Sequence, residues 1–265
     1  MTGPPARGIA FTKASACGND FLIVAGEGVA GDLAVISRRM CDRHHGIGAD
    51  GVEWLFPDAD ADTHALLYNA DGSEAEVSGN GTRCIAAWLS AQSGKSEVLI
   101  RTGAGLKRCR LTGRKNHTFE FEADMGAPVL GGETVVTTPG AAVAGTKVSM
   151  GNPHFVIFVE SFPERWQHEA GLIAAQREFP EGTNVEYVVV RGANEIEIRL
   201  FERGVGETLS SGTGSCAAAV AAIDRRSISS PVRVVAPGGA QTVRWDGSVF
   251  LQGPATLICR GEFFV

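Results

Sequence analysis

Residues 78–91 read SGNGTRCIAAWLSA and residues 211–224 read SGTGSCAAAVAAID, so one S-G-x-G motif precedes an apolar run twice, 133 residues apart. In each copy the glycines indicate a turn where backbone can approach a ligand. The apolar residues that follow recur at helical spacing. The two stretches therefore predict helices over Asn80 to Ala91 and Thr213 to Asp224. The second is apolar nearly all round, which is typical of a helix buried in the middle of its domain.

The offset of 133 holds along the rest of the chain. The further matches are Gly18-Asn19 with Gly151-Asn152, Val52-Glu53-Trp54 with Val185-Glu186-Tyr187, Leu67-Tyr68 with Leu200-Phe201, Glu74 with Glu207, and Gly105 with Gly238. Such a repeat indicates a duplicated domain rather than shared turn signals. We expect one half at 8–125 and the other at 145–256. Glycine and proline at 131–132 and 137–140 predict a linker at 126–144. Residues 257–265 would form a tail, for which a return to the first half is one option.

Ten short segments rich in β-branched or aromatic residues and bounded by turn residues predict strands. They are 21–26, 65–70, 97–102, 118–123, 154–160, 185–190, 195–201, 232–236, 241–245 and 248–253. The predicted fold class is therefore α+β, with two pseudo-symmetric domains. Each is a layer of strands wrapped around a central helix, and we expect the active site in the cleft between them.

Composition limits the classes of function. With 265 residues, 44% hydrophobic and 20% charged, the chain has the make-up of a globular protein. Its apolar runs are too short for a membrane span, and its start has no secretory signal, so we expect a cytoplasmic protein. The net charge of −6 without basic clusters argues against nucleic acid. Six cysteines without metal spacing predict free thiols and no metal site.

The S-G-x-G motifs have a chemical use. The first turn of a helix offers N–H groups and a positive dipole end, which suit a carboxylate. Ser78 and Ser211 are also ordinary N-cap residues, so capping is the alternative. Two domains related by a dyad would direct both helix N-termini at one cleft. Inversion of a stereocentre needs that arrangement, because one group removes the α-proton and another delivers a proton to the opposite face.

Six motifs, in order, resemble those of the diaminopimelate epimerase family over nearly the whole chain. They are GNDF at 18–21, CDRHHGIGADGV at 41–52, NADGSEAEVSGNGTRC at 69–84, MGNPHF at 150–155, FPEGTNVE at 179–186 and ERGVGETLSSGTGSCAAA at 202–219. The resemblance implies an isomerase of lysine and peptidoglycan precursor biosynthesis that interconverts LL- and meso-diaminopimelate. It also implies no cofactor, neither pyridoxal phosphate nor metal, and a small-molecule amino acid as partner, with a homodimer as an option.

The resemblance also implies which residues form the site. Ser78, Ser211, His154 and Glu202 take the catalytic positions. The substrate would be bound by Asn19, Asn69, Gly79, Asn80, Gly81, Asn152, Asn184, Glu202, Arg203, Gly212 and Thr213. Each has an ordinary alternative: the asparagines as turn residues, Glu202 and Arg203 as a surface ion pair, and His154 as a histidine hydrogen-bonded in a strand.

Ser78 and Ser211 stand where the family carries two catalytic cysteines. Cys84 and Cys216 lie well inside the predicted helices and cannot replace them. An alcohol is a far weaker acid than a thiol and needs an adjacent base. Three readings stay open: serines activated by His154, Glu74, Glu207 or water; a relative with altered chemistry, such as another racemase, isomerase or dehydratase; or a silent amino-acid binder, natural or made by two cysteine-to-serine substitutions. The loop at 15–20, SACGND, also departs from the HGLGND that the family often has, at a place that the resemblance puts beside the substrate.

Overall fold

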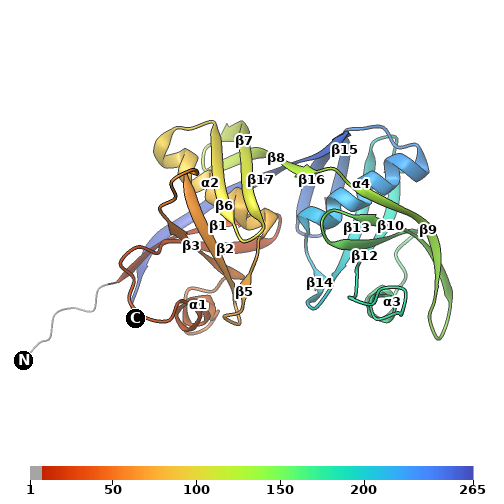
Figure 1. The fold of residues 1–265 in the computed structure, drawn as a ribbon, viewed down its shortest axis with the longest axis horizontal. Coiled ribbons are helices and arrows are strands. Elements are labelled where there is room, and N and C mark those ends of the chain that lie inside the picture. The colour runs from red at the N-terminus through yellow and green to blue at the C-terminus, as the bar shows by residue number, and fades with distance from the viewer. Residues whose placement is uncertain (1–7, 265) are drawn as a thin grey trace, which may run out of the picture. The chain divides into compact units, whose positions relative to one another are not determined.

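The computed structural model describes residues 8–264, which fall into two compact units (Figure 1). One unit comprises the chain up to Ala123 together with the segment from Pro254 onward, and the other is Asp124–Gly253. No helix in the described part is both long and apolar enough to cross a membrane. The described cysteines are all free, as predicted.

The first unit is a closed ring of strands around one helix. Its elements are β1 (Ile9–Ala16), β2 (Asn19–Ala25), α1 (Leu33–Cys41), β3 (Gly51–Phe56), β4 (Thr63–Asn69), β5 (Glu74–Ala75), α2 (Gly79–Ser93), β6 (Glu97–Thr102), β7 (Gly105–Lys115), β8 (Thr118–Gly126) and the later part of β17 (Ser248–Phe263). The pairing runs β1–β2–β3–β4–β6–β7–β8–β17, and β17 pairs again with β1. Closure leaves the ring without an unpaired edge.

The second unit repeats the order of these elements around one central helix. Its elements are β9 (Val129–Thr137), β10 (Ala142–Ser149), β11 (Pro153–Phe158), α3 (Trp166–Ala174), β12 (Asn184–Gly192), β13 (Glu195–Glu202), β14 (Gly206–Thr208), α4 (Gly212–Arg226), β15 (Val232–Ala236), β16 (Gly239–Asp246) and the start of β17. Three elements, β10, α3 and α4, lie 133 residues after β1, α1 and α2 at both of their ends. The predicted α+β repeat is therefore confirmed.

The two central helices are held by caps and by apolar burial. Ser78 and Ser211 are the N-caps of α2 and α4, and Gly94 and Ser227 end these helices in the left-handed conformation with φ of 72° and 53°. The Cys84 and Cys216 side chains are fully buried in the two cores, as predicted for structural cysteines. Strands wrapped around a central helix are thus present in both units.

The predicted linker at 126–144 is wrong, because β9 and the start of β10 occupy it. These strands form an antiparallel hairpin, with Thr137 opposite Ala142, and residues 138–141 alone make the turn. Gly131 and Gly132 lie inside β9, where Gly132 takes a φ of 78° beside a register shift. A glycine pair usually indicates a loop, but in β9 it accommodates a bulge within a strand. The second unit accordingly begins at Asp124 instead of 145 and ends at Gly253 instead of 256.

The segment from Pro254 onward lies with the first unit, where Phe263 pairs opposite Ile9 of β1. It gives β1 the antiparallel neighbour that β9 gives β10 in the second unit. Helices α1 and α3 were not predicted from the sequence. The first of them is capped by Asp32, whose carboxylate accepts from Ala34 N at 2.8 Å.

Candidate functional site

Both serines cap a helix and lie against its first turn. Ser78 Oγ accepts from Gly81 N at 3.1 Å, and Ser211 Oγ accepts from Gly214 N at 3.3 Å. The capping alternative is therefore present in the structure. Capping also places each oxygen in the positive field of a helix N-terminus, which stabilises negative charge on it. A weak acid such as a serine hydroxyl loses its proton more easily in this position.

Glu202 lies beside Ser211 at the end of β13. Thr208 Oγ1 donates to Glu202 Oε1 at 2.7 Å, and the Ser211 hydroxyl bonds to the same carboxylate. Burial raises the pKa of Glu202 above its usual value, and those hydrogen bonds together with the charge of His154 offset only part of the rise. A carboxylate with a raised pKa next to a hydroxyl is a suitable general base. In the repeat, the position of Glu202 is taken by the neutral Asn69.

His154 is fully buried on β11 and uses both ring nitrogens. Its Nδ1 is hydrogen-bonded to Glu186 Oε1 at 2.7 Å, and its Nε2 to Asn152 Oδ1 at 3.0 Å. Asn152 Nδ2 in turn donates to Thr213 Oγ1 at 3.4 Å. His154 is thus hydrogen-bonded within a strand, the alternative given above to a catalytic role. It fixes the orientation of Asn152 and Thr213 at the start of α4.

Asn184 holds the backbone next to Arg203. Its Nδ2 donates to the Pro153 carbonyl at 2.9 Å, and its Oδ1 accepts from Arg203 N at 2.9 Å. The Arg203 side chain is exposed, and its Nη1 donates to the Glu181 carbonyl at 2.9 Å. Across residues 8–264 no ion pair joins Arg203 to Glu202. The exposed guanidinium therefore keeps donors for a ligand carboxylate.

In the first unit, hydrogen-bonded amides link a buried cation to a carboxylate. Arg83 Nη2 donates to Asn80 Oδ1 at 2.5 Å, and Asn80 Nδ2 donates to Asn19 Oδ1 at 2.6 Å. Asn19 Nδ2 then donates to Asp50 Oδ2 at 3.2 Å. Because an arginine can only donate and a carboxylate only accept, this chain determines which way both amides face. Asn69 is the last residue of β4, and its Nδ2 donates to Ser73 Oγ at 3.0 Å.

The predicted site residues thus form one cluster in each unit. Around the start of α2 lie Asn19, Ser78, Gly79, Asn80 and Gly81, and Asn69 is at the end of β4. Around the start of α4 lie Asn152, His154, Asn184, Glu202, Arg203, Ser211, Gly212 and Thr213.

Two acids that could have activated the serines are placed elsewhere. Glu207 is exposed and accepts from Gln167 Nε2 at 3.2 Å, while its neighbour Thr208 faces Glu202. Glu74 is exposed in the same way. Alternation along a strand explains this, because successive side chains point to opposite faces. Glu202, and not Glu207, therefore lies beside Ser211.

Three buried charged residues near the helix starts were not predicted from the sequence: Arg83, Glu53 and Glu186. The signal was present in the repeat, where Val52-Glu53-Trp54 matches Val185-Glu186-Tyr187. A glutamate in the middle of two otherwise apolar strands is a buried polar group that needs a reason.

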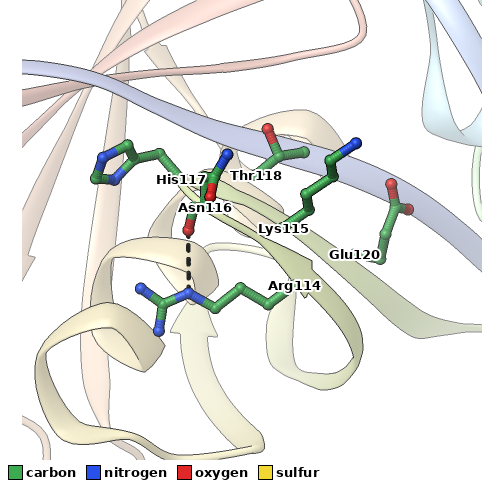
Figure 2. Close-up of a pocket in the computed structure, with 6 residues that line it drawn as sticks. All are labelled: Arg114, Lys115, Asn116, His117, Thr118 and Glu120. Carbon is green, nitrogen blue, oxygen red and sulfur yellow. Dashed lines mark hydrogen bonds between the residues drawn. The ribbon is translucent and has the colours of Figure 1, made fainter.

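An open hollow of about 540 Å³ lies at the turn between β7 and β8, lined by Arg114, Lys115, Asn116, His117, Thr118 and Glu120 (Figure 2). Arg114 Nε donates to the Asn116 carbonyl at 3.1 Å there. None of the predicted site residues lines this hollow, so it does not belong to either cluster. Residues 8–264 also contain no group of three or more His, Cys, Asp or Glu side chains placed to hold a metal ion.

Replacing Gly81 by alanine should destabilise the protein. A Cβ there would stand 2.0 Å from Glu53 Oε1, so the packed carboxyl would have to move. Such overpacking costs about 1–3 kcal/mol, and we expect a loss of that size in urea unfolding of Gly81→Ala. Gly113→Ala is the control, because a Cβ there meets its first neighbour at 3.7 Å. Equal stability of both variants would contradict the packing described.

Known proteins match the chain over nearly its full length. The sequence model of the family described as diaminopimelate epimerase matches residues 11–131 and 146–258. A diaminopimelate epimerase from Agathobacter rectalis is 37% identical, covering 95% of this chain and 98% of the relative. Another, from Moorella thermoacetica, is 36% identical, covering 96% and 98%.

Solved structures with low sequence identity share the fold. A phenazine biosynthesis protein of the PhzF family from Bacillus anthracis has a TM-score of 0.73 at 15% identity, covering 98% of this chain and all of that one. A hydroxyproline epimerase from Agrobacterium vitis has a TM-score of 0.71 at 15% identity, covering 97% and 91%. The sequence matches, together with the duplicated fold, show that the chain belongs to the diaminopimelate epimerase family.

Proposed function

We propose that this chain interconverts LL- and meso-diaminopimelate by removing and returning the proton of one α-carbon. The observation that carries the proposal is the duplicated helix start, with a capping serine at each. Membership of the family supports the choice of substrate. Ser78 and Ser211 would address opposite faces of the α-carbon, and the two helix N-termini would bind its carboxylate.

The cluster around Ser211 contains the acid Glu202, whereas the matching residue of the first unit is the neutral Asn69. This difference suggests which serine removes the α-proton and which one supplies a proton. On one face the Ser211 hydroxyl passes its proton to Glu202 as Ser211 Oγ takes the α-proton. The electron pair of the broken C–H bond moves toward the substrate carboxylate, where the helix N-termini stabilise it. On the other face, where the residue matching Glu202 is Asn69, the Ser78 hydroxyl delivers its proton to carbon. The Ser78 alkoxide then takes a proton from solvent, and Glu202 releases one to solvent. The reverse reaction exchanges these roles.

Binding of the substrate would use the remaining polar groups. Arg203 has an exposed guanidinium that can hold a carboxylate with two parallel hydrogen bonds. Asn19, Asn80 and Asn152 have orientations determined by charged or buried partners, which suits selection of an amino acid by hydrogen bonding. The proposed ligand is thus a zwitterion with a second charged end.

A second candidate is an amino-acid binder without turnover, and the two serines favour it. Alcohols are poor bases for a carbon acid even beside a carboxylate. Calorimetry and isotope exchange separate the two functions, because binding needs the polar clusters and exchange also needs the serines.

We expect calorimetry to detect binding of diaminopimelate to this protein. We also expect the α-proton of the bound diaminopimelate to exchange slowly in deuterated water. Both LL- and meso-diaminopimelate should release heat, while proline and glutamate, which lack the second amino-acid end, should not. Heat without exchange would identify the silent binder. No heat with either stereoisomer would contradict the proposed substrate.

For its setting, we propose the cytoplasm, where the exposed Cys259 and the other free thiols would stay reduced. Assembly as a homodimer is also a proposal.

A further inference from the structure

Glu53 is a buried carboxyl group at the start of α2 that the proposed mechanism does not use. It lies on β3, 3% exposed, and pairs with Ile23 of β2 on one side and Leu67 of β4 on the other. A glutamate on the inner face of a strand ring costs free energy unless it is hydrogen-bonded or serves a purpose. The repeat contains it twice, since Glu186 is the matching residue of β12.

The Glu53 carboxyl is close to Ser78 across a single glycine. The vacant Cβ position of Gly81 lies 2.0 Å from Glu53 Oε1 and 3.2 Å from Ser78 Cβ. The same glycine donates its N–H to Ser78 Oγ. In the second unit, the vacant Cβ position of Gly214 likewise lies between Glu186 Oε1 at 2.9 Å and Ser211 Cβ at 3.1 Å. Each serine therefore has a buried glutamate behind its helix turn.

The two glutamates differ in what neutralises them. Glu186 is hydrogen-bonded to His154, whereas the residue in the first unit that matches His154 is Phe21. The titratable group facing Glu53 from α2 is the Cys84 thiol, which burial keeps protonated, and its strand neighbours are apolar. Among residues 8–264 no cation offsets the burial of Glu53, so its anion is disfavoured and its pKa is raised to about 8.

We propose that Glu53 is a positioning residue of the Ser78 cluster, where its neutral carboxyl supports the first turn of α2 without adding negative charge behind the bound substrate carboxylate. The inference rests on the proposed function, because that carboxylate is the group the helix start would hold. An ionised Glu53 would oppose the positive end of α2 and repel both the carboxylate and the charge that develops on it. Glu53 thus makes binding and exchange sensitive to alkaline pH.

Titration of Glu53 should reduce exchange at alkaline pH and not at acidic pH, because the protein is active with Glu53 protonated. Below pH about 8 Glu53 is protonated and the helix start is free to bind an anion. As pH rises through that value, a buried negative charge appears and kcat/KM for exchange should fall by about tenfold per pH unit. In Glu53→Gln, which keeps the shape and cannot ionise, this fall should disappear.

Glu186→Gln is the matched variant, because it removes the corresponding carboxyl of the second unit. Whatever its rate, it should keep the alkaline fall of the parent protein. The proposal is overturned if Glu53→Gln and the parent protein lose activity over the same pH range with the same slope. Should Glu53→Gln fail to fold, Glu53→Met tests the same point with an apolar side chain of similar length.

Infrared spectroscopy keeps this test separate from that of the proposed function. At pH 7 the spectrum of the parent protein minus that of Glu53→Gln should contain the band of a protonated carboxyl, and the band should vanish as pH rises through about 8. Absence of the band overturns the proposal. If exchange proves undetectable, the epimerase proposal fails, and the pH dependence of diaminopimelate binding in calorimetry decides on Glu53: equal alkaline weakening in both proteins overturns it.

Discussion

Changing Ser78 and Ser211 together to cysteine should raise the rate of α-proton exchange by about 10²–10⁴-fold. A thiol has an ordinary pKa near ~8.5, far below that of an alcohol, and a helix N-terminus lowers it further. Both new side chains would stand at N-caps whose oxygens already accept from the first helical turn. The measurement is the rate at which diaminopimelate incorporates deuterium from deuterated water.

Single variants and a distant cysteine make this test specific. Ser78→Cys or Ser211→Cys alone should help less, because inversion needs a competent group on each face. Ser90→Cys adds a thiol to the buried side of the same helix, α2, and should leave the rate unchanged. A double variant no faster than the parent protein would show that the hydroxyls are part of a differently built site.

Glu202→Gln should lower the exchange rate by about 10²–10⁴-fold, since it removes the carboxylate that takes the Ser211 proton. The pH dependence supplies a second check. The pKa of Glu202 is raised by burial, and the base must be ionised, so the rate in the parent protein should fall as pH drops through that raised pKa. The variant should lose this acid limb along with its activity.

Glu207→Gln is the control for that substitution. Glu207 lies on the neighbouring strand β14, where it is exposed and accepts from Gln167, so its change should leave the rate near that of the parent protein. A larger loss in Glu207→Gln than in Glu202→Gln would contradict the placement of the base.

Much of the fold was accessible from the sequence because duplication repeats its signals. The S-G-x-G motifs and the apolar runs after them predicted α2 and α4 to within one or two residues of each end. The β9 hairpin was missed because Gly131 and Gly132, which normally indicate a loop, lie at a bulge inside a strand. A bulge depends on the partner strand, which local composition does not describe.

The site was predictable for residues inside motifs and not for their partners. The S-G-x-G motif located Ser211, but the sequence left both Glu202 and Glu207 as candidates for the acid beside it. Only the alternation of side chains along the strand shows that Glu202 faces Ser211 and Glu207 faces away. Arg83 and Glu53 were missed for a related reason. Their roles depend on burial and on hydrogen bonds to residues far away in the chain, such as the one from Asn80 to Asn19.

The pairing of β1 with the far end of β17 has a consequence for how the protein is made. As the chain leaves the ribosome, β1 to β8 emerge first, but the strand that closes their ring emerges after the whole second unit. Domains usually complete folding in the order of synthesis, and here the order is inverted. Until then β1 exposes an unpaired edge to neighbouring nascent chains, the situation in which strands aggregate. The exposure of this edge ends when the later part of β17 has been made and pairs with β1.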